Sequence, residues 1–280
     1  MVQEAVERFD YSSTSKLYTP TYFNRTYNTY NITYDRNSEN YTIVILFYQR
    51  DKQLTYTLST FAKLANLHKV LVVWNDVERE VDPDLIPVLH VSIVVLKMTK
   101  NSLNNRFLPF VEIETDAVLN MDDDFNVDHH VIELMFDVWK SNRRAIVGPN
   151  ARYASASLNS TKAVYAMPEN GVYNIILTSG TFIHKDIHLA YTILMSPKIR
   201  IKVDQITNCE DIAINFLVCH LYLDAATIKV TGIQNTHGKY ANHGLHQRGK
   251  SHYSNREKCV DEFTQLYGYL PLVSRKWKVV

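Results

Sequence analysis

From residue 41 onward, short continuous runs of apolar residues alternate with stretches that carry apolar side chains at helical spacing. Apolar runs of this length are typical of strands that are covered on both faces. Residues 51–66 have the helical pattern, with Asp51 placed to cap the helix, and residues 83–89 allow a short helix. The strands expected here span residues 42–47, 69–74, 91–96 and 117–121. This alternation predicts an α/β fold with a mainly parallel central sheet and helices on both faces.

The second half of the chain has a more mixed pattern. Strands are expected over residues 163–166, 173–177 and 227–230, and helices over residues 186–194, 210–223 and 257–267. Residues 235–256 are polar and rich in His, Gly and Asn, which indicates a loop or lid. Its histidines lack the tight spacing of a zinc site, so a loop that folds over a substrate is favoured.

The first 40 residues lack apolar periodicity and are rich in Tyr, Asn and Thr, which predicts a surface arm or stem that ends near Asn40. Four sequons for N-glycosylation occur, although such triplets also arise by chance; they lie at Asn24, Asn31, Asn40 and Asn159. Residues 1–10 carry acids where a secretory leader needs an apolar core, and no apolar stretch has the length of a membrane helix. Taken alone, these two observations favour a cytosolic protein.

Composition narrows the class of partner. The chain has 30 basic and 29 acidic side chains, and this balance argues against a global electrostatic grip on nucleic acid or on an anionic membrane. No G-x-G-x-x-G motif follows the first strand and no P-loop motif is present, so dinucleotide and P-loop functions are disfavoured. The three cysteines, Cys209, Cys219 and Cys259, match no zinc spacing and allow one disulfide with one thiol left over.

Three consecutive carboxylates, Asp122, Asp123 and Asp124, follow the last strand of the first half. Adjacent carboxylates repel one another, and their oxygens suit a hard cation such as Mg²⁺ or Mn²⁺ that also holds substrate phosphates. The alternative is a solvated turn before a helix that Asp124 caps. The position at a strand end of a βαβ array, where ligands gather, favours the metal site.

A second acidic pair, Glu210 and Asp211, opens an amphipathic helix. Acids in a first helical turn are routine because the helix dipole favours negative charge there. The functional alternative directs one carboxylate into a substrate pocket, where it would accept hydrogen bonds from a sugar or stabilise positive charge. Arg50, Arg106 and Arg256 could each bind a diphosphate, or form a surface salt bridge instead.

With these residues in place, the sequence resembles the exostosin and exostosin-like glycosyltransferases over roughly residues 41–270. The resemblance rests on an ordered set of motifs at residues 48–51, 69–75, 105–107, 112–117, 122–124, 208–216 and 252–259. It implies the GT-A fold of nucleotide-diphospho-sugar transferases, with a donor half over about 41–150 and an acceptor half over about 151–280. It also implies Mn²⁺, with Mg²⁺ as a substitute, and transfer of N-acetylhexosamine from a UDP-sugar with retention of configuration. GlcNAc is the favoured sugar, and the implied acceptor is a heparan sulfate-type glycosaminoglycan chain.

The resemblance also implies a role for individual residues. Arg50, Asn75, Asn101 and Arg106 match contacts to the nucleotide and donor sugar, and Glu210 is expected to bind the substrate as well. Asp122 and Asp123 match residues that hold ribose and sugar hydroxyls, Asp124 the metal ligand, Asp211 the catalytic carboxylate and Arg256 a diphosphate contact. Cys209 and Cys259 match a paired disulfide, which leaves Cys219 free.

Two departures from the family pattern near the donor keep a second function open. Leu46 stands where relatives commonly carry Gln, and Glu210 stands where they commonly carry Asp. The alternative is a catalytically weakened member that binds glycan or serves as the partner subunit of a related polymerase, in a homo- or hetero-oligomer. The resemblance, the disulfide that it implies and the clustered sequons together move the expected compartment to the secretory lumen, Golgi or endoplasmic reticulum, with no membrane anchor in this chain.

Overall fold

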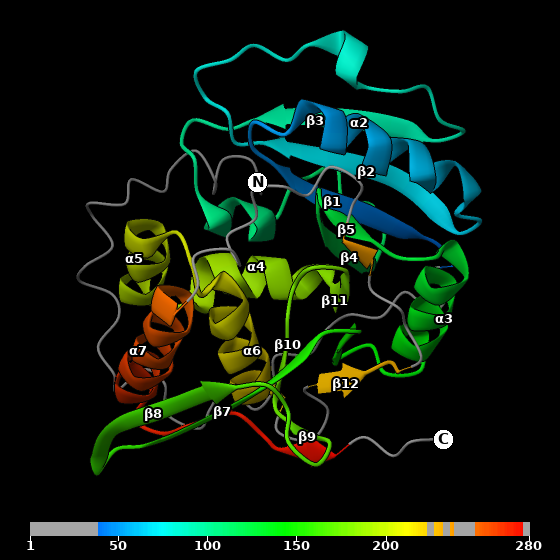
Figure 1. Ribbon diagram of the computed structural model, residues 1–280. Helices are drawn as coiled ribbons and strands as arrows, with labels where there is room; N and C mark the ends of the chain where they lie inside the picture. The colour runs from blue at the N-terminus through cyan, green and yellow to red at the C-terminus, as the bar shows by residue number, and fades with distance from the viewer. Residues whose placement is uncertain (1–38, 223–226, 232–235, 238–249, 277–280) are drawn as a thin grey trace.

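A seven-stranded sheet forms the centre of the computed structural model, which describes residues 39–222, 227–231, 236–237 and 250–276 (Figure 1). The arm, with Asn24 and Asn31, and the middle of the expected lid lie outside the described residues. In spatial order the strands are β12 (Thr227–Lys229), β6 (Ile146–Gly148), β11 (Thr181–His184), β4 (Ala117–Asp122), β1 (Tyr41–Phe47), β2 (Leu67–Trp74) and β3 (Ser92–Lys97). All neighbours are parallel except that β11 runs antiparallel to β4 and β6, so the predicted mainly parallel sheet is confirmed.

The alternating side chains of β1 show why both faces of the sheet are covered. Ile43 and Ile45 lie in one apolar cluster with residues of helices α2 (Asp51–Thr60) and α3 (His129–Lys140). Val44, between them, belongs to a second cluster under the segment that follows β3. Burial on both faces explains why the strands read as continuous apolar runs rather than as alternating ones.

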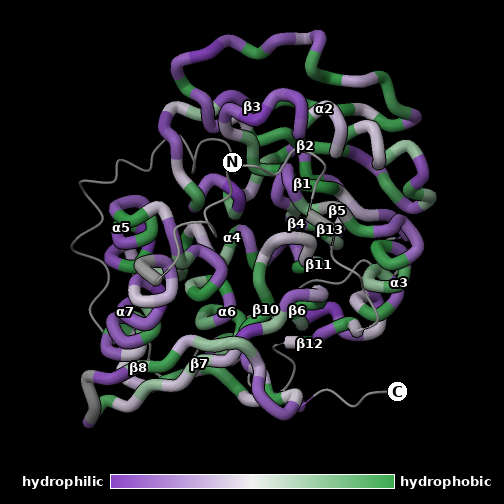
Figure 2. The backbone as a smooth tube through the Cα atoms, in the orientation of Figure 1, coloured by the Kyte–Doolittle hydropathy of each residue, from purple (hydrophilic) through white to green (hydrophobic). Residues whose placement is uncertain are grey.

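Helix α6 (Glu210–Leu221) is the central helix below the sheet. It packs against α4 (Lys185–Leu194), α5 (Pro197–Ile206), α7 (Lys250–Tyr267) and strand β10 (Ile175–Ile176). Because these partners surround it, residues 211–219 are all buried, and the run 212–219 is apolar except for Asn215; the predicted amphipathic pattern of this helix is therefore wrong. Figure 2 shows the hydrophobic colour gathered in the central strands, with hydrophilic stretches along the outer loops.

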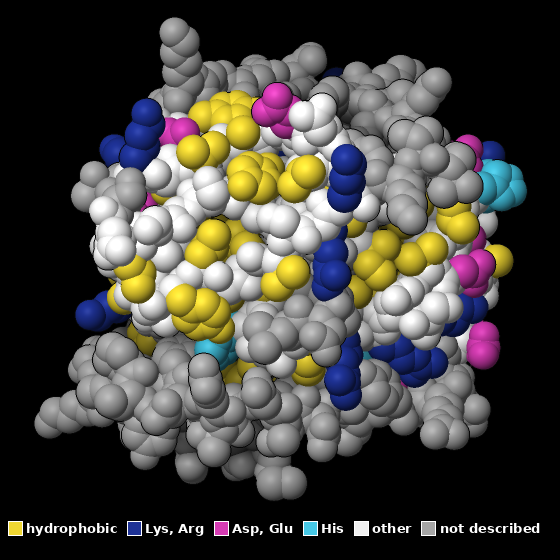
Figure 3. All heavy atoms as spheres, turned by 90° about the horizontal axis from the view of Figure 1, so that it is seen from below, with side chains coloured by type: hydrophobic (Ala, Val, Ile, Leu, Met, Phe, Trp, Pro, Cys, Tyr) yellow, Lys and Arg dark blue, Asp and Glu magenta, His cyan; other side chains and the backbone are white. Residues whose placement is uncertain are grey.

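The remaining strands build small sheets outside the central one. β7 (Ala151–Ser157) and β8 (Ser160–Ala166) form a hairpin that β10 extends and that α7 crosses. Two ribbons pair β5 (Phe125–Asn126) with β13 (Thr236–His237), and β9 (Val172–Tyr173) with β14 (Arg275–Lys276). Short 3₁₀ helices η4 (Phe61–Lys63), η5 (Pro83–Leu85) and η6 (Leu103–Phe107) complete the described chain. Seen from below, this side of the molecule shows apolar side chains among polar ones, crossed by a row of Lys and Arg (Figure 3).

Two expected boundaries are wrong because side chains find partners in other parts of the chain. The cap of α2 is Arg50 rather than Asp51, because the Asp51 carboxylate accepts hydrogen bonds from Arg79 at 3.0–3.1 Å. The strand expected over residues 173–177 is interrupted at Asn174. The Asn174 side chain accepts a hydrogen bond from the Ala154 amide and donates one to the Ala154 carbonyl.

Two further boundaries concern helices. The expected loop 235–256 ends early, since α7 already begins at Lys250. Asp124 does not cap the helix that follows the acidic triplet; Asp128 caps α3, and its carboxylate accepts from the His130 amide at 2.8 Å. Among the described helices, none combines the length and the apolar character that a membrane crossing requires.

The core predicts a sharp contrast between two positions of α3. Phe136 is fully buried against the rings of Tyr41 and Phe182, whereas Leu134 is 49% exposed. Phe136→Ala should lower the free energy of unfolding by about 3–5 kcal/mol because it leaves a cavity. Leu134→Ala, the matched control on the same helix, should change it by about 0.5 kcal/mol or less. Urea unfolding followed by circular dichroism measures both, and equal losses would contradict the packing described.

Candidate active site

The carboxyl ends of β1, β2 and β4 bring the predicted donor residues to one edge of the sheet. The three strands are parallel neighbours, with Leu46 of β1 opposite Asp122 and Phe47 opposite Trp74. Arg50, Asn75 and the acidic triplet each follow directly after one of these strands. This is the edge where ligands of open α/β sheets bind.

The Arg50 guanidinium holds two carboxylates of the triplet. Its Nε donates to Asp123 Oδ2 at 3.0 Å, its Nη2 is paired with the other oxygen of Asp123, and its Nη1 donates to Asp124 Oδ2 at 2.6 Å. Asp123 is fully buried, and burial raises the pKa of its carboxyl to about 7 although Arg50 opposes the shift. The Thr57 hydroxyl of α2 donates to the Asp123 carbonyl at 2.6 Å. Arg50 is thus part of the site and not a surface salt bridge.

The outer carboxylates of the triplet fit a divalent cation. The Asp122 and Asp124 side chains are 34% and 16% exposed, and each uses one oxygen in its arginine contact. Partly exposed carboxylate oxygens at a sheet edge are the ligands that Mg²⁺ and Mn²⁺ prefer. Among the described residues, a close group of three ligand atoms, within 4.8 Å of one another, occurs instead at Asp128, His129 and His130 on the surface end of α3. In the triplet, Asp123 and Asp124 instead meet at Arg50, and Asp122 turns to Arg106.

Asn75 is held in place rather than exposed. Its side chain is buried, donates to the Ser102 carbonyl at 2.9 Å and accepts from Asn105 at 2.8 Å. Asn105 also donates to the Lys100 carbonyl at 2.8 Å. These bonds bind the end of β2 to the segment before η6. Asn101 lies in the same segment with its side chain on the surface.

Arg106 connects the triplet to the start of helix α6. It is buried, pairs with Asp122 and donates to the Met121 carbonyl at 3.1 Å. Burial alone lowers the pKa of its guanidinium, but Asp122, Glu210 and Asp211 outweigh this and raise the pKa above its usual value. The two acidic motifs, almost 90 residues apart in the sequence, therefore act on one arginine.

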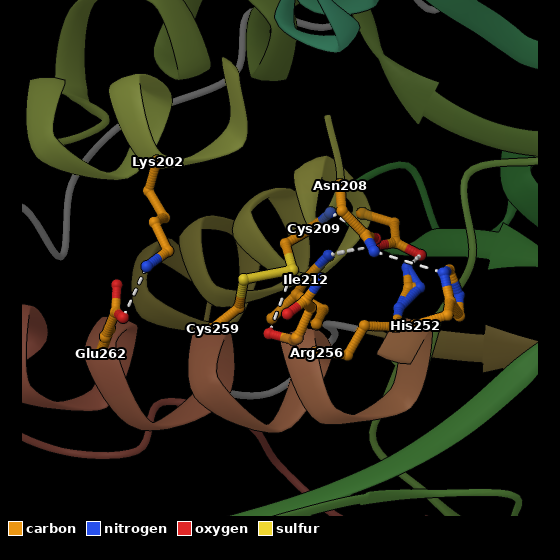
Figure 4. Close-up of a disulfide and its surroundings, with 10 residues drawn as sticks. Lys202, Asn208, Cys209, Ile212, His252, Arg256, Cys259 and Glu262 are labelled. Atoms are coloured by element: carbon orange, nitrogen blue, oxygen red, sulfur yellow. Dashed lines mark hydrogen bonds and ion pairs between the residues drawn. A yellow bond between two sulfur atoms is a disulfide. The ribbon is translucent and has the colours of Figure 1, made fainter. Parts of the chain in front are cut away.

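At the start of α6, Asp211 forms a buried ion pair with Arg256 of α7. The predicted disulfide between Cys209 and Cys259 is confirmed, and it joins these two helices beside the pair (Figure 4). Cys219 is a buried free thiol, as expected. Lys202 of α5 adds an ion pair to Glu262 of α7 at 2.6 Å. Asp211 and Arg256 are thus set in a rigid corner rather than on a mobile helix end.

Glu210, beside Asp211, has an unusual electrostatic environment. Burial, and next the charge of Asp211, raise the pKa of the Glu210 carboxyl to about 7, while Arg106 and Arg256 oppose the shift. Perturbed carboxyl groups of this kind are frequent at functional sites.

The described sequons, Asn40 and Asn159, are exposed and lie away from this corner, Asn159 between β7 and β8.

The structure adds two residues to the site that the sequence did not single out. Asn105 supports Asn75, and Tyr165 of β8 lies with its ring 4.8 Å from the Arg256 guanidinium. Asn105 stands next to Arg106 within a motif that carries the resemblance. Tyr165 has no such signal, because it reads as one more inward residue of a short strand.

This sheet and the carboxylate-bearing edge define a GT-A-type glycosyltransferase. A solved structure of GalNAc-T7 with UDP, GalNAc and Mn²⁺ has the same fold, with a TM-score of 0.54 and 11% identity over 75% of this chain and 45% of that one. The chain belongs to the exostosin family, since the glycosyl transferase family 64 domain matches residues 41–280.

The curated relatives include the exostosin-like-3 homolog of Caenorhabditis elegans, 40% identical over 242 residues that make up 85% of this chain and 29% of the relative. Human exostosin-2 is 33% identical over 239 residues, 84% of this chain and 33% of the relative. The chain therefore spans about a third of the length of the curated relatives it matches.

Glu210 predicts a dependence of stability on pH. A carboxyl whose pKa is raised on folding binds its proton more tightly in the folded state. Its contribution to the free energy of unfolding therefore falls as pH rises from about 4.5 to 7. Glu210→Gln should match the wild type near pH 4.5 and be more stable above pH 7, by on the order of a few kcal/mol.

Urea titrations at four pH values, in buffer with a chelator, measure this difference. Glu80→Gln, which removes a 90% exposed carboxylate, controls for the loss of one negative charge. A Glu210→Gln variant that is less stable than the wild type at pH 8 would contradict the assigned environment.

Proposed function

We propose that this chain carries the catalytic domain of a retaining transferase that moves N-acetylhexosamine, with GlcNAc favoured, from a UDP-sugar to a heparan sulfate-type glycosaminoglycan acceptor. The observation that carries the proposal is the meeting of two sets of charged groups, the triplet with Arg50 and Arg106 on one side and the Asp211–Arg256 pair on the other. Cations and carboxylates in one place match a reaction that separates an anionic diphosphate from a positively charged sugar.

Mn²⁺ is the proposed cofactor, with Mg²⁺ as a substitute, and Asp124 is its proposed ligand. When bound, such an ion supplies positive charge to the diphosphate oxygens. Asp122 and Asp123 are the proposed acceptors of hydrogen bonds from the ribose and the sugar. Asp123, which is fully buried against Arg50, would serve in this role once Arg50 turns toward the phosphates. Asn75, Asn101 and Arg106 are the further proposed donor contacts.

Asp211 and Arg256 are the proposed catalytic corner. Glycosyl transfer passes through positive charge at the anomeric carbon, and a carboxylate held beside that carbon stabilises it. Arg256 pairs with Asp211 in its buried position, and its proposed role is to stabilise the departing diphosphate oxygen. The acceptor hydroxyl can then lose its proton to that oxygen, and Glu210, with its raised pKa, lies beside this path.

The second candidate function is a glycan-binding or partner subunit of a related polymerase in the secretory lumen. It is favoured by Leu46 and by Glu210, whose side chain is longer than that of the Asp that relatives commonly carry beside Asp211. This alternative retains donor binding but lacks transfer.

Donor binding has a direct test. UDP should raise the melting temperature only when Mn²⁺ or Mg²⁺ is present, because the cation joins Asp124 to the diphosphate. Asp124→Ala should abolish the shift, and the matched control Asp128→Ala, six residues from Asp122 on the exposed end of α3, should retain it. Differential scanning fluorimetry with a chelator control measures both, and a UDP shift that is absent from the wild type would refute the proposed function.

Transfer distinguishes the two functions. With UDP-GlcNAc, Mn²⁺ and a heparosan-type oligosaccharide, the wild type should extend the acceptor by one α-linked residue, detected by mass spectrometry and NMR. Asp211→Asn should lower the rate by about 10²-fold or more, since it removes the charge that faces the sugar cation. Donor binding without any transfer would instead support the partner-subunit function.

A further inference from the structure

The Asp211–Arg256 pair has a third neighbour that comes from a different part of the fold. Tyr165 lies on β8, and its ring stands 4.8 Å from the Arg256 guanidinium carbon, in the geometry of a cation–π contact. Strand β8 packs directly against α7, so this contact joins the outer hairpin to the helix that carries Arg256.

Tyr165 is anchored by its ring and not by its hydroxyl. The side chain is 4% exposed, and its ring also meets that of Tyr253 at 6.0 Å. Among the described residues, the buried Tyr165 hydroxyl has no hydrogen-bond partner. An unpaired buried hydroxyl contributes nothing favourable to the position of the side chain, so its packing against Arg256 and Tyr253 places it.

Both members of the Asp211–Arg256 pair act electrostatically on Tyr165. Burial raises the pKa of its hydroxyl, Arg256 lowers it and Asp211 raises it again, so both members of the ion pair are within electrostatic reach. Arg256 is 6% exposed, and in the described chain its Nε has no hydrogen-bond partner. Asp211 fixes the guanidinium at one end only, and an aromatic face is what restrains the rest.

We propose that Tyr165 is a positioning residue for the transfer reaction: its ring holds the Arg256 guanidinium in the plane that serves both Asp211 and the leaving diphosphate. That Tyr165 restrains Arg256 follows from the cation–π geometry, whereas its effect on transfer rests on the proposed function. The disulfide at Cys259, one turn from Arg256, restrains the helix backbone, and Tyr165 restrains the side chain.

Substitutions of Tyr165 distinguish the contribution of its ring from that of its hydroxyl. Tyr165→Phe keeps the ring and removes an unpaired hydroxyl, so transfer should stay within about twofold of the wild type. Tyr165→Leu removes the ring, and kcat should fall about 10- to 100-fold with little change in the KM for the acceptor, because a group that acts in the transition state is misplaced. Tyr165→Met fills similar volume and takes the place of the leucine variant if that one does not fold.

Tyr173→Leu is the matched control. Tyr173 is a 5% exposed tyrosine of the same apolar cluster, and its hydroxyl accepts from the Lys229 amide at 3.0 Å. Its loss should lower stability as much as the loss of Tyr165 does, or more, and leave kcat near the wild-type value. Equal effects of Tyr165→Leu and Tyr173→Leu on kcat, or a Tyr165→Phe variant as impaired as Tyr165→Leu, would overturn the proposal.

A second measurement does not depend on activity. In ¹⁵N-arginine-labelled protein, hydrogen exchange at the Arg256 Nε–H should be faster in Tyr165→Leu and unchanged in Tyr165→Phe. The Arg106 Nε–H, which is also buried and also without a partner among the described residues, is the internal control and should not change. An inactive wild type with this exchange pattern refutes the proposed function alone, whereas unchanged exchange at Arg256 refutes the role of Tyr165.

Discussion

A buried arginine needs hydrogen-bond acceptors for its N–H groups and negative charge to offset its positive charge. Arg106 obtains both from two separate parts of the fold. Its guanidinium pairs with Asp122 at the end of β4, and it lies within electrostatic reach of Glu210 and Asp211 at the start of α6. An unpaired buried charge is strongly destabilising. The sheet edge and the first turn of α6 are therefore held in one geometry by a requirement for charge compensation.

The same requirement explains the rest of the site. Arg50 compensates Asp123, which is fully buried, and Arg256 compensates Asp211. Each arginine reaches its carboxylate from a different segment, so the charges gather only after the chain is folded. A nearly neutral protein in this way gathers several buried charges between the edge where parallel strands end and the start of α6.

Rigid supports surround these pairs. The Asn75–Asn105 bond ties β2 to the segment before η6, the disulfide ties α6 to α7, and Tyr165 closes the corner from the outer hairpin. Preorganised charges stabilise a transition state without reorganisation at the moment of reaction. Under the proposed function, the supports therefore serve the chemistry as well as the stability of the fold.

The sequence by itself determined the parallel strands, because a strand buried on both faces must be apolar throughout, and it determined the acidic triplet at the end of one of them. It also located α6, although it indicated an amphipathic helix where the fold buries residues 211–219. It failed at the start of α2, where Asp51 pairs with Arg79, and within residues 173–177, where Asn174 bonds β7, because those contacts lie far away in the chain. Only the tertiary structure decided which arginine meets which carboxylate, and it alone brought a tyrosine of β8 to Arg256. The physical reason is that long side chains take their partners from whatever element packs beside them.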